Sequence, residues 1–332
     1  MSASASTPAL IALDWGTTSL RAYLLGDDGV ALDTRASSAG IMNLPAGGFD
    51  QAFEETCGDW LGMFDSQAPR TARLPVIAAG MVGSAQGWVE APYVDTPAGA
   101  AALVAGIVKV KTARGGIVHV VPGVLEKGVL PNVMRGEETQ IFGALASDAA
   151  LNEADGALIG LPGTHAKWAF VGNDRIERFY TFMTGETFGA LRDHTILGRT
   201  MHPSATHDEQ AFVRGVDTAR DAGHPGLLAT IFSTRTLGLT GQLSAEQQAD
   251  YLSGLLIGHE LRGLNEVLAR DQSSLAGRTL RLIGNDALCD RYRAALARFG
   301  CTDAATVAHA TERGLYRIAA LAGLVSAPVR AA

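Results

Sequence analysis

One local plan occurs twice in this chain, and it limits the folds that the chain can adopt. Each copy is a strand, a Gly-Thr turn, a second strand, a short turn and a third strand. The expected strands are 10–14, 19–25 and 30–34 in the first copy and 157–161, 166–171 and 175–182 in the second. At an offset of 147 positions, Gly16 superposes on Gly163 and Thr17 on Thr164. Few positions are identical, so the shared order of elements is what predicts a duplicated domain.

The remaining segments alternate between strand and helix patterns. Further strands are expected at 74–79, 116–121 and 279–283, and helices at 137–150, 184–197, 208–221, 225–237, 245–270, 287–299 and 311–326. Thr96-Pro97 has the pattern of a helix N-cap followed by proline at the first helical position. Alternating strands and helices in two equivalent halves predict an α/β protein, with one domain at 1–150, a second at 151–332 and a cleft between them.

Composition excludes several classes of function. The net charge of −7 disfavours nucleic-acid binding, because there is no excess of Lys and Arg to displace phosphate counterions. The apolar stretch around 98–110 is shorter than the ~20 residues that a membrane span needs. Three cysteines without a CxxC spacing argue against a disulfide framework or a zinc site and are consistent with a reducing cytoplasm. We therefore expect a soluble cytoplasmic protein that binds neither nucleic acid nor a membrane. A homodimer stays open as its assembly.

The turn DWGTTS, at residues 14–19, is the sharpest chemical signal in the sequence. Asp14 ends a buried strand, where a carboxylate can hold a hydrated Mg²⁺. Gly16 allows the backbone to approach a phosphate, and Thr17 and Thr18 supply hydroxyl and amide donors. The alternative is an ordinary hairpin in which Asp14 only caps the turn. The second Gly-Thr turn, correctly placed, favours the functional interpretation.

Three stretches carry a resemblance to a known superfamily. LDWGTTSLRAYLL resembles the first phosphate loop of the sugar kinases, actin and the heat-shock chaperone ATPases, LIGLPGTHAKWAFV resembles the second, and LIGNDALCDRY resembles the adenosine loop. The stretches MVGS, RGEETQ and GTHAKW together resemble one family within it, the 2-dehydro-3-deoxygalactonokinases, over residues 9–326. Ser19 departs from the Asn of many members, a small polar exchange.

The resemblance implies a fold of two actin-like, ribonuclease H-like domains and a defined reaction. That reaction is transfer of the ATP γ-phosphate, with Mg²⁺, to the 6-hydroxyl of 2-dehydro-3-deoxy-D-galactonate in galactonate catabolism. The sugar acid would lie on the first domain and the nucleotide largely on the second. The alternatives are a kinase of another 2-keto-3-deoxy sugar acid or of an aldonate, or a regulatory ATPase of the same fold without catalysis.

The second phosphate loop and the adenosine loop are the expected nucleotide contacts. Gly163 and Thr164 would cradle the β- and γ-phosphates, and Gly284 with Asn285 would pass beneath the purine. His165 and Lys167 share one face of the expected strand, so both could reach phosphate oxygens. A solvated lysine at the strand edge is the equal alternative for Lys167.

The segment RGEETQ resembles the turn that carries the catalytic carboxylate in related members. Glu137 and Glu138 are both candidates for the general base, and Glu137 is preferred because it directly follows Gly136. The other glutamate would stabilise the helix N-terminus. Arg135 is a candidate for binding the substrate carboxylate, with a surface ion pair as the alternative.

Other substrate contacts are expected in the first domain. Arg21 lies between core-facing residues, so a buried guanidinium that needs a carboxylate partner is expected there. The turns GIMN and GMVGS are interpreted as sugar-binding loops or, alternatively, as plain turns. Their candidate substrate contacts are Asn43, Met81, Gly83 and Ser84.

Two Gly-Thr turns in different domains lead to a prediction about domain closure. Binding ATP and the sugar acid together should compact the molecule more than either ligand alone, because closure excludes the water that would hydrolyse ATP. Small-angle X-ray scattering of the protein alone, with each ligand and with both will measure this. Identical dimensions in all four states would contradict a closing cleft.

Overall fold

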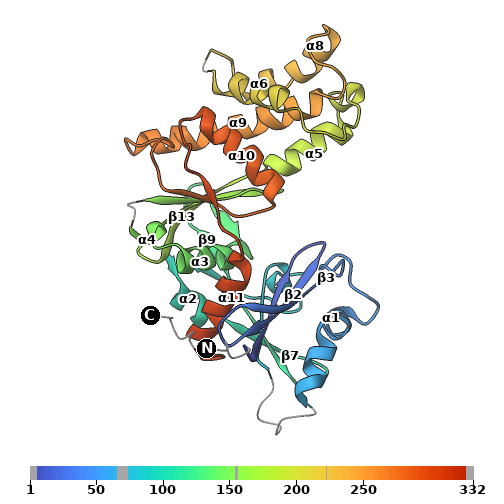
Figure 1. Cartoon of the computed structure of the whole chain (residues 1–332), viewed down its shortest axis with the longest axis vertical. Helices are drawn as coiled ribbons and strands as arrows, with labels where there is room; N and C mark the ends of the chain where they lie inside the picture. The colour runs from blue at the N-terminus through green and yellow to red at the C-terminus, as the bar shows by residue number, and fades with distance from the viewer. Residues whose placement is uncertain (1–5, 66–73, 154–155, 222, 327–332) are drawn as a thin grey trace, which may run out of the picture. The chain divides into compact units, whose positions relative to one another are not determined.

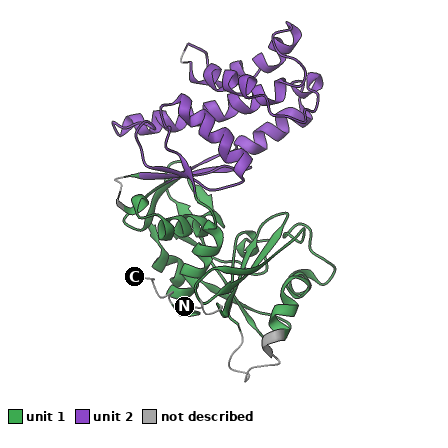
Figure 2. Ribbon diagram, in the orientation of Figure 1, with its two compact units in different colours: residues 1–156, 170–179, 307–332 green, residues 157–169, 180–306 purple. Residues whose placement is uncertain are grey.

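The computed structural model describes residues 6–65, 74–153, 156–221 and 223–326. The chain divides into two compact units (Figures 1 and 2). Unit 1 contains residues 1–156, 170–179 and 307–332, and unit 2 contains residues 157–169 and 180–306. The C-terminal segment therefore belongs to unit 1, whereas the expected division after residue 150 placed it in the second domain.

The largest sheet of unit 1 is built on the first copy of the repeat. Its order is β3-β2-β1-β4-β8-β7. The strands are β1 (Pro8–Trp15), β2 (Leu20–Gly26), β3 (Ala31–Ser37), β4 (Val76–Ala79), β7 (Val108–Lys111) and β8 (Ile117–Val120). β1, β2 and β3 are antiparallel neighbours, whereas β4 runs parallel to β1 and β8 parallel to β4. Tight turns join antiparallel strands, and longer connections are needed to bring parallel strands together.

The second copy of the repeat has the same topology. The third sheet has the order β15-β14-β11-β12-β13-β6. Its strands are β6 (Ala98–Gly99), β11 (Ala157–Leu161), β12 (Ala166–Gly172), β13 (Arg175–Phe182), β14 (Leu280–Leu282) and β15 (Ala305–Thr306). β11, β14 and β15 are parallel, as are β1, β4 and β8. The shared order of five strands confirms both the duplication and the α/β fold class.

Unit 1 also contains a three-stranded sheet that the sequence analysis missed, with the order β10-β9-β5. Its strands are β5 (Tyr93–Asp95), β9 (Gly123–Glu126) and β10 (Asn132–Met134). The helices of this unit are α1 (Gly48–Asp65), the 3₁₀ turn η1 (Met81–Gly83), α2 (Ala100–Ala105), α3 (Glu137–Ser147), α4 (Ala150–Glu153) and α11 (Ala310–Leu321). The helix expected at 137–150 ends early because Asp148 is extended, and its carboxylate accepts from the Ala150 amide (3.0 Å), where α4 begins.

Helices predominate in unit 2 (Figure 1). They are α5 (Thr184–His194), the 3₁₀ turn η2 (Gly198–Thr200), α6 (Glu209–Arg220), α7 (Leu227–Thr230), α8 (Ser233–Leu239), α9 (Gln248–Arg270) and α10 (Asp286–Arg298). Gln247 accepts a hydrogen bond from the Ser244 amide (2.9 Å), which is one arm of a capping box. None of the helices that the structure describes has both the length and the apolar character needed to cross a membrane.

Three further helix assignments made from the sequence are wrong. Thr96-Pro97 does not begin a helix, because Ala98 and Gly99 pair with Ile176 and Arg175 as a strand, and α2 starts only at Ala100. The helix expected at 225–237 is two short helices, α7 and α8. The last helix ends at Leu321 and not near 326, since Gly323 (φ 71°) supplies the left-handed residue that commonly follows a helix end.

The core of unit 1 reaches the strand end that carries Asp14. Trp15 is fully buried, and its indole N–H donates to the Ala39 carbonyl (2.8 Å). Its ring meets Phe49 of α1 edge-on, at 5.4 Å between ring centroids, and Phe49 stacks on Trp88 at 5.9 Å. Aromatic packing therefore holds both the C-terminal end of β1 and the turn that follows it.

Glycines allow α3 and α11 to cross with their backbones in contact. A Cβ at Gly314 would lie 1.7 Å from the Thr139 carbonyl oxygen, and one at Gly143 would lie 1.8 Å from that of Ala310. No side chain fits at such distances. This crossing attaches the C-terminal helix to the helix that begins at Glu137.

We expect Gly314→Ala to destabilise unit 1, because the added methyl group forces the two helices apart. Overpacking of this kind costs about 1–3 kcal/mol. Gly62→Ala is the matched control, since a Cβ at this α1 position has no neighbour within 4 Å and alanine favours a helix. Thermal unfolding of both variants will measure the effect. A Gly314→Ala protein that melts with the wild type would contradict the close crossing.

Candidate active site

Four turns of unit 1 meet through contacts at glycine. A Cβ at Gly40 would lie 2.4 Å from the Ser19 amide nitrogen, and one at Gly80 would lie 2.7 Å from the Trp15 carbonyl oxygen. Gly136 packs on Gly80, because a Cβ added at Gly136 would lie 3.2 Å from the Gly80 Cα. Gly80 and Gly136 have φ angles of 96° and 110°, which other residues rarely adopt. The first phosphate-type turn, the two candidate sugar loops and the RGEETQ turn therefore gather at one place.

Backbone hydrogen bonds hold the first phosphate-type turn, both within the turn and from the neighbouring GIMN turn. The Gly16 amide donates to the Ser19 carbonyl (2.9 Å), and the amides of Ile41 and Met42 donate to the carbonyls of Gly16 and Thr17 (3.1 Å each). Thr17 and Thr18 are exposed, so their side chains are accessible at the rim of the turn. The hydroxyl groups of Thr17 and Thr18 are therefore accessible to a ligand.

Asp14 lies at the strand end beside this turn. Its side chain is 25% exposed, and its nearest cation is Arg21, at 3.9 Å. Burial raises the pKa of Asp14; Arg21 opposes that shift, while the like charges of Glu137 and Glu312 add to it. Glu312, on α11, is a neighbour that the sequence analysis missed, because 298 positions separate it from Asp14.

The two glutamates of RGEETQ lie in different environments. Glu138 is fully buried and accepts from the Gly136 amide at 2.9 and 2.7 Å. Burial and the Glu137 charge raise the pKa of Glu138 to about 8, so it is largely protonated at neutral pH. Glu137 is partly exposed, accepts from the Arg135 amide (3.0 Å) and is close enough to Asp14 to raise its pKa. Of the two, only Glu137 is in contact with solvent.

Arg135 lies beside Gly83, with most of its guanidinium donors buried. Its guanidinium stacks on the Tyr93 ring (4.3 Å), and Nη2 donates to the Ala91 carbonyl (2.9 Å). Nε, Nη1 and the Ser84 hydroxyl are buried without a hydrogen-bond partner among the described residues. A Cβ at Gly83 would lie 3.0 Å from Nη1, so glycine leaves space beside these donors. Among the described residues, Arg135 forms no ion pair with a carboxylate, so the surface ion pair considered as its alternative is not formed.

The expectation of a buried Arg21 is wrong. Its side chain is 58% exposed and pairs with Asp14, whereas Tyr23, on the same face of β2, is buried. Asn43 is also exposed and donates weakly to the Thr18 carbonyl (3.5 Å), whereas Met81 is half-buried at the start of η1.

The second Gly-Thr turn lies in unit 2, packed against the start of α5. A Cβ at Gly185 would lie 2.5 Å from the Gly163 carbonyl oxygen, and the Glu186 amide donates to the Thr164 carbonyl (3.0 Å). The Glu186 carboxylate is hydrogen-bonded to the His165 ring, and both side chains are about half exposed. This bond orients His165 and joins residues 21 positions apart, so local sequence pattern does not reveal it.

Lys167 and the adenosine-type loop complete the unit 2 candidates. Lys167 is 5% exposed, so the solvated lysine considered as an alternative is wrong. Gly284 packs on the second Gly-Thr turn, because a Cβ added at Gly284 would lie 3.5 Å from the Pro162 carbonyl oxygen. Asn285 caps α10, and its side chain accepts from the Leu288 amide (3.4 Å).

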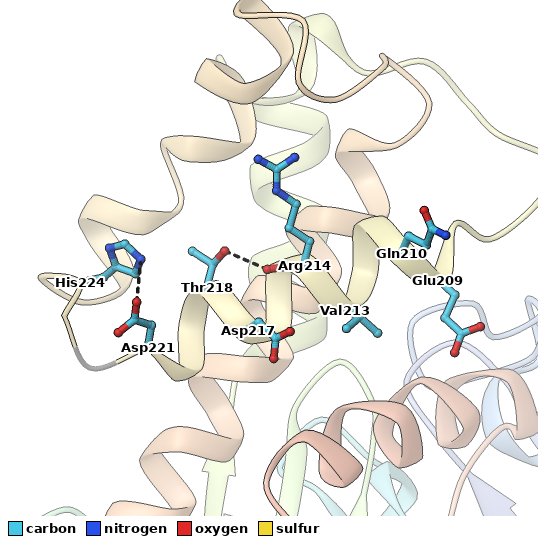
Figure 3. A pocket seen from close by; sticks show the side chains of 8 residues that line it. All are labelled: Glu209, Gln210, Val213, Arg214, Asp217, Thr218, Asp221 and His224. Atoms are coloured by element: carbon cyan, nitrogen blue, oxygen red, sulfur yellow. Dashed lines mark hydrogen bonds and ion pairs between the residues drawn. The ribbon is translucent and has the colours of Figure 1, made fainter.

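A cavity of about 670 Å³ lies away from all of these residues, along α6. Its lining is Glu209, Gln210, Val213, Arg214, Asp217, Thr218, Asp221 and His224 (Figure 3). His224 is paired with Asp221, and Asp217 with Arg298, so these charges are already balanced. No predicted site residue lines it.

Comparisons with known proteins identify relatives of this chain. The chain is 34% identical to a 2-dehydro-3-deoxygalactonokinase of Escherichia coli (strain K12) over 296 residues, 89% of this chain and 91% of the relative. It is similar to a crystal structure of a candidate 2-dehydro-3-deoxygalactonokinase from Sinorhizobium meliloti, with a TM-score of 0.80 and 35% identity over 94% of this chain and 98% of that one.

The duplicated fold and these relatives define the class of protein, a sugar kinase that transfers a phosphoryl group to an alcohol. The model of the 2-keto-3-deoxy-galactonokinase family matches residues 14–318, and the chain belongs to that family.

The electrostatic setting of Asp14 leads to a prediction that separates function from stability. We expect Asp14→Asn to lose most Mg²⁺-dependent turnover while its melting temperature stays the same or rises. The pKa of Asp14 is raised in the folded state, so folding disfavours the ionised form, and a neutral side chain removes that penalty. Kinase assays and thermal unfolding will measure both quantities. Near-normal activity in the folded variant would rule out the metal role of Asp14.

Proposed function

We propose that the protein transfers the γ-phosphoryl group of ATP to the 6-hydroxyl of 2-dehydro-3-deoxy-D-galactonate. The observation that carries this proposal is the guanidinium of Arg135, whose buried Nε and Nη1 have no partner among the described residues. Buried unpaired donors cost free energy, and a bound carboxylate would offset that cost. The substrate class of the family has such a carboxylate at C1. Ser84 would donate to an oxygen of the same ligand.

Glu137 is the proposed general base. It would accept the proton of the 6-hydroxyl as the hydroxyl oxygen forms its bond to the γ-phosphorus and the bond to the departing ADP oxygen breaks. The arrangement of the turns supports this role, because Glu137 starts α3 directly after Gly136, which packs on Gly80 of a candidate sugar loop. Glu138 would hold the turn through the Gly136 amide.

The nucleotide contacts are proposed on both phosphate-type turns and the adenosine-type loop. Gly16, Thr17 and Thr18 supply backbone and hydroxyl donors in unit 1. In unit 2 the proposed contacts are Gly163, Thr164, His165, Lys167, Gly284 and Asn285. The contact between Gly284 and Pro162 supports a common role, since it holds the second phosphate-type turn beside the adenosine-type loop.

Mg²⁺ is the metal that such a reaction uses, and the donors at Asp14 fit it. The described residues hold no cluster of three or more His, Cys, Asp or Glu side chains that could bind a metal alone. Mg²⁺ commonly keeps several waters and takes one or two carboxylates together with phosphate oxygens. Asp14 would hold it through water, and the ion would neutralise phosphate charge. The like charges of Glu137 and Glu312 near Asp14 support a cation at this place.

We also propose that the enzyme works in the cytoplasm. All three cysteines are buried free thiols, a state that a reducing compartment maintains. A homodimer stays a prediction.

A substrate panel will test the proposed function. ADP release is measured with 2-dehydro-3-deoxy-D-galactonate, its gluconate epimer, the parent aldonates and neutral sugars of the same length. We expect the 2-keto-3-deoxy acids to be phosphorylated and the neutral sugars to be poor substrates. Arg135→Met should raise KM for the acids and leave the neutral sugars unaffected. Preference for an aldonate would assign the site to a different sugar acid, and sugar-independent hydrolysis alone would contradict the kinase.

The different environments of the two glutamates lead to a prediction about the base. We expect Glu137→Gln to lower kcat by ~10²–10⁴ with little change in sugar-acid KM, as loss of a general base does. Glu138→Gln is the paired variant, and its effect on kcat should be smaller because its carboxyl group is buried against the Gly136 amide. Steady-state kinetics at saturating ATP will measure both. The reverse ranking would exchange their roles.

A further inference from the structure

A buried carboxylate in unit 2 accepts hydrogen bonds from three side chains. Glu260, on α9, is 3% exposed. Its Oε1 accepts from the Trp168 indole (2.6 Å), and its Oε2 accepts from the Tyr292 hydroxyl (2.8 Å) and from the Thr184 hydroxyl. The Trp168 and Tyr292 rings also contact each other, at 6.3 Å between centroids. None of the proposed chemistry uses this group.

Each donor belongs to a segment that holds one of the nucleotide candidates. Trp168 follows Lys167 on β12, the strand that leaves the second Gly-Thr turn. Thr184 begins α5, whose next two residues contact that turn through Gly185 and Glu186. Tyr292 lies on α10, the helix that Asn285 caps. One carboxylate therefore joins the three segments that carry the phosphate-type turn, its supporting helix and the adenosine-type loop.

We propose that Glu260 is a positioning residue for the nucleotide. By accepting from Trp168, Thr184 and Tyr292, it holds the second Gly-Thr turn and the adenosine-type loop at the spacing that one nucleotide spans. This inference rests on one part of the proposed function, which is that unit 2 binds the nucleotide. It does not depend on which sugar acid is phosphorylated.

The chemistry of the carboxylate suits this role. Two oxygens with four lone-pair directions can accept from three donors, whereas an amide offers one accepting oxygen and adds two donors. A charged group without a cation is costly in a buried position. Burial accordingly raises the pKa of Glu260 to about 7, and the bonds from Thr184, Trp168 and Tyr292 oppose the shift. An apolar side chain would fill the same space at less cost but would leave the three donors unpaired and free to separate.

The test is nucleotide affinity in the full-length Glu260→Gln variant. The glutamine side chain has the same shape but carries no charge. If its oxygen accepts from Trp168, its NH₂ group must donate to the Tyr292 and Thr184 hydroxyls, so bonds to an ionised acceptor are replaced by weaker neutral ones. We expect Kd for ADP, measured by calorimetry, and KM for ATP to rise about tenfold, as loss of a hydrogen bond to a charged group implies. KM for the sugar acid should change by less than about twofold, because its proposed contacts lie in unit 1.

Two further variants complete the experiment. Glu266→Gln is the matched control, since Glu266 is on the same helix, is 62% exposed and pairs with Arg262 at the surface. It should leave both constants unchanged. Tyr292→Phe removes a single bond and should raise Kd for ADP about threefold, and it decides the question if Glu260→Gln does not fold.

The outcomes distinguish this inference from the proposed function. A Glu260→Gln protein that loses thermal stability but keeps the wild-type Kd for ADP overturns the inference, because Glu260 then serves packing alone. An equal rise in both KM values also overturns it. A wild type that binds ADP but phosphorylates no acid in the panel overturns the proposed substrate, and the Kd comparison still decides the role of Glu260. A wild type that binds no ADP overturns both.

Discussion

Backbone contact between turns is the constraint on which the unit 1 site depends. Gly80 lies against the Trp15 carbonyl, and Gly136 lies against Gly80. Both glycines have positive φ, so a side chain would be strained by conformation and also blocked by its neighbour. These contacts bring the strand end of Asp14 and the start of α3 together without any interposed side chain. The spacing between the Asp14 strand end and the start of α3 is therefore set by main-chain contact at Gly80 and Gly136.

Environment gives three acidic residues of this region different chemical properties. Glu138 is buried against a backbone amide and has a pKa of about 8, whereas Glu137 is partly exposed. The pKa of Asp14 is raised by burial and by neighbouring carboxylates, which a cation would relieve. Separating the pKa values of nearby carboxyl groups is a common way to assign acid, base and metal-binding roles within one site. Unit 2 uses a carboxylate differently, since Glu260 organises donors and is far from solvent.

The two copies of the repeat share one strand order but differ in the segments added around it. In each copy the first strand leads into a Gly-Thr turn at the end of a parallel set. In unit 1 the added segments around this frame are the sugar loops and the three-stranded sheet, which supplies Tyr93 beneath Arg135. In unit 2 they are helices α5 to α10, and Glu260 on α9 accepts hydrogen bonds from α5, α10 and the strand β12. Function thus differs between the copies through what surrounds a shared frame.

The sequence by itself determined the strands of both repeats, the turns between them, the α/β class and the family resemblance. These depend on alternation, turn residues and capping, which act within a few residues of the chain. Tertiary structure decided that Arg21 faces outward, that Arg135 has unpaired donors and that Glu137 and Glu138 differ in burial. It also decided the strand at 98–99 and the contacts of Glu260 with Trp168, 92 positions away. Burial and electrostatic neighbours come from such distant segments, so local pattern cannot specify them.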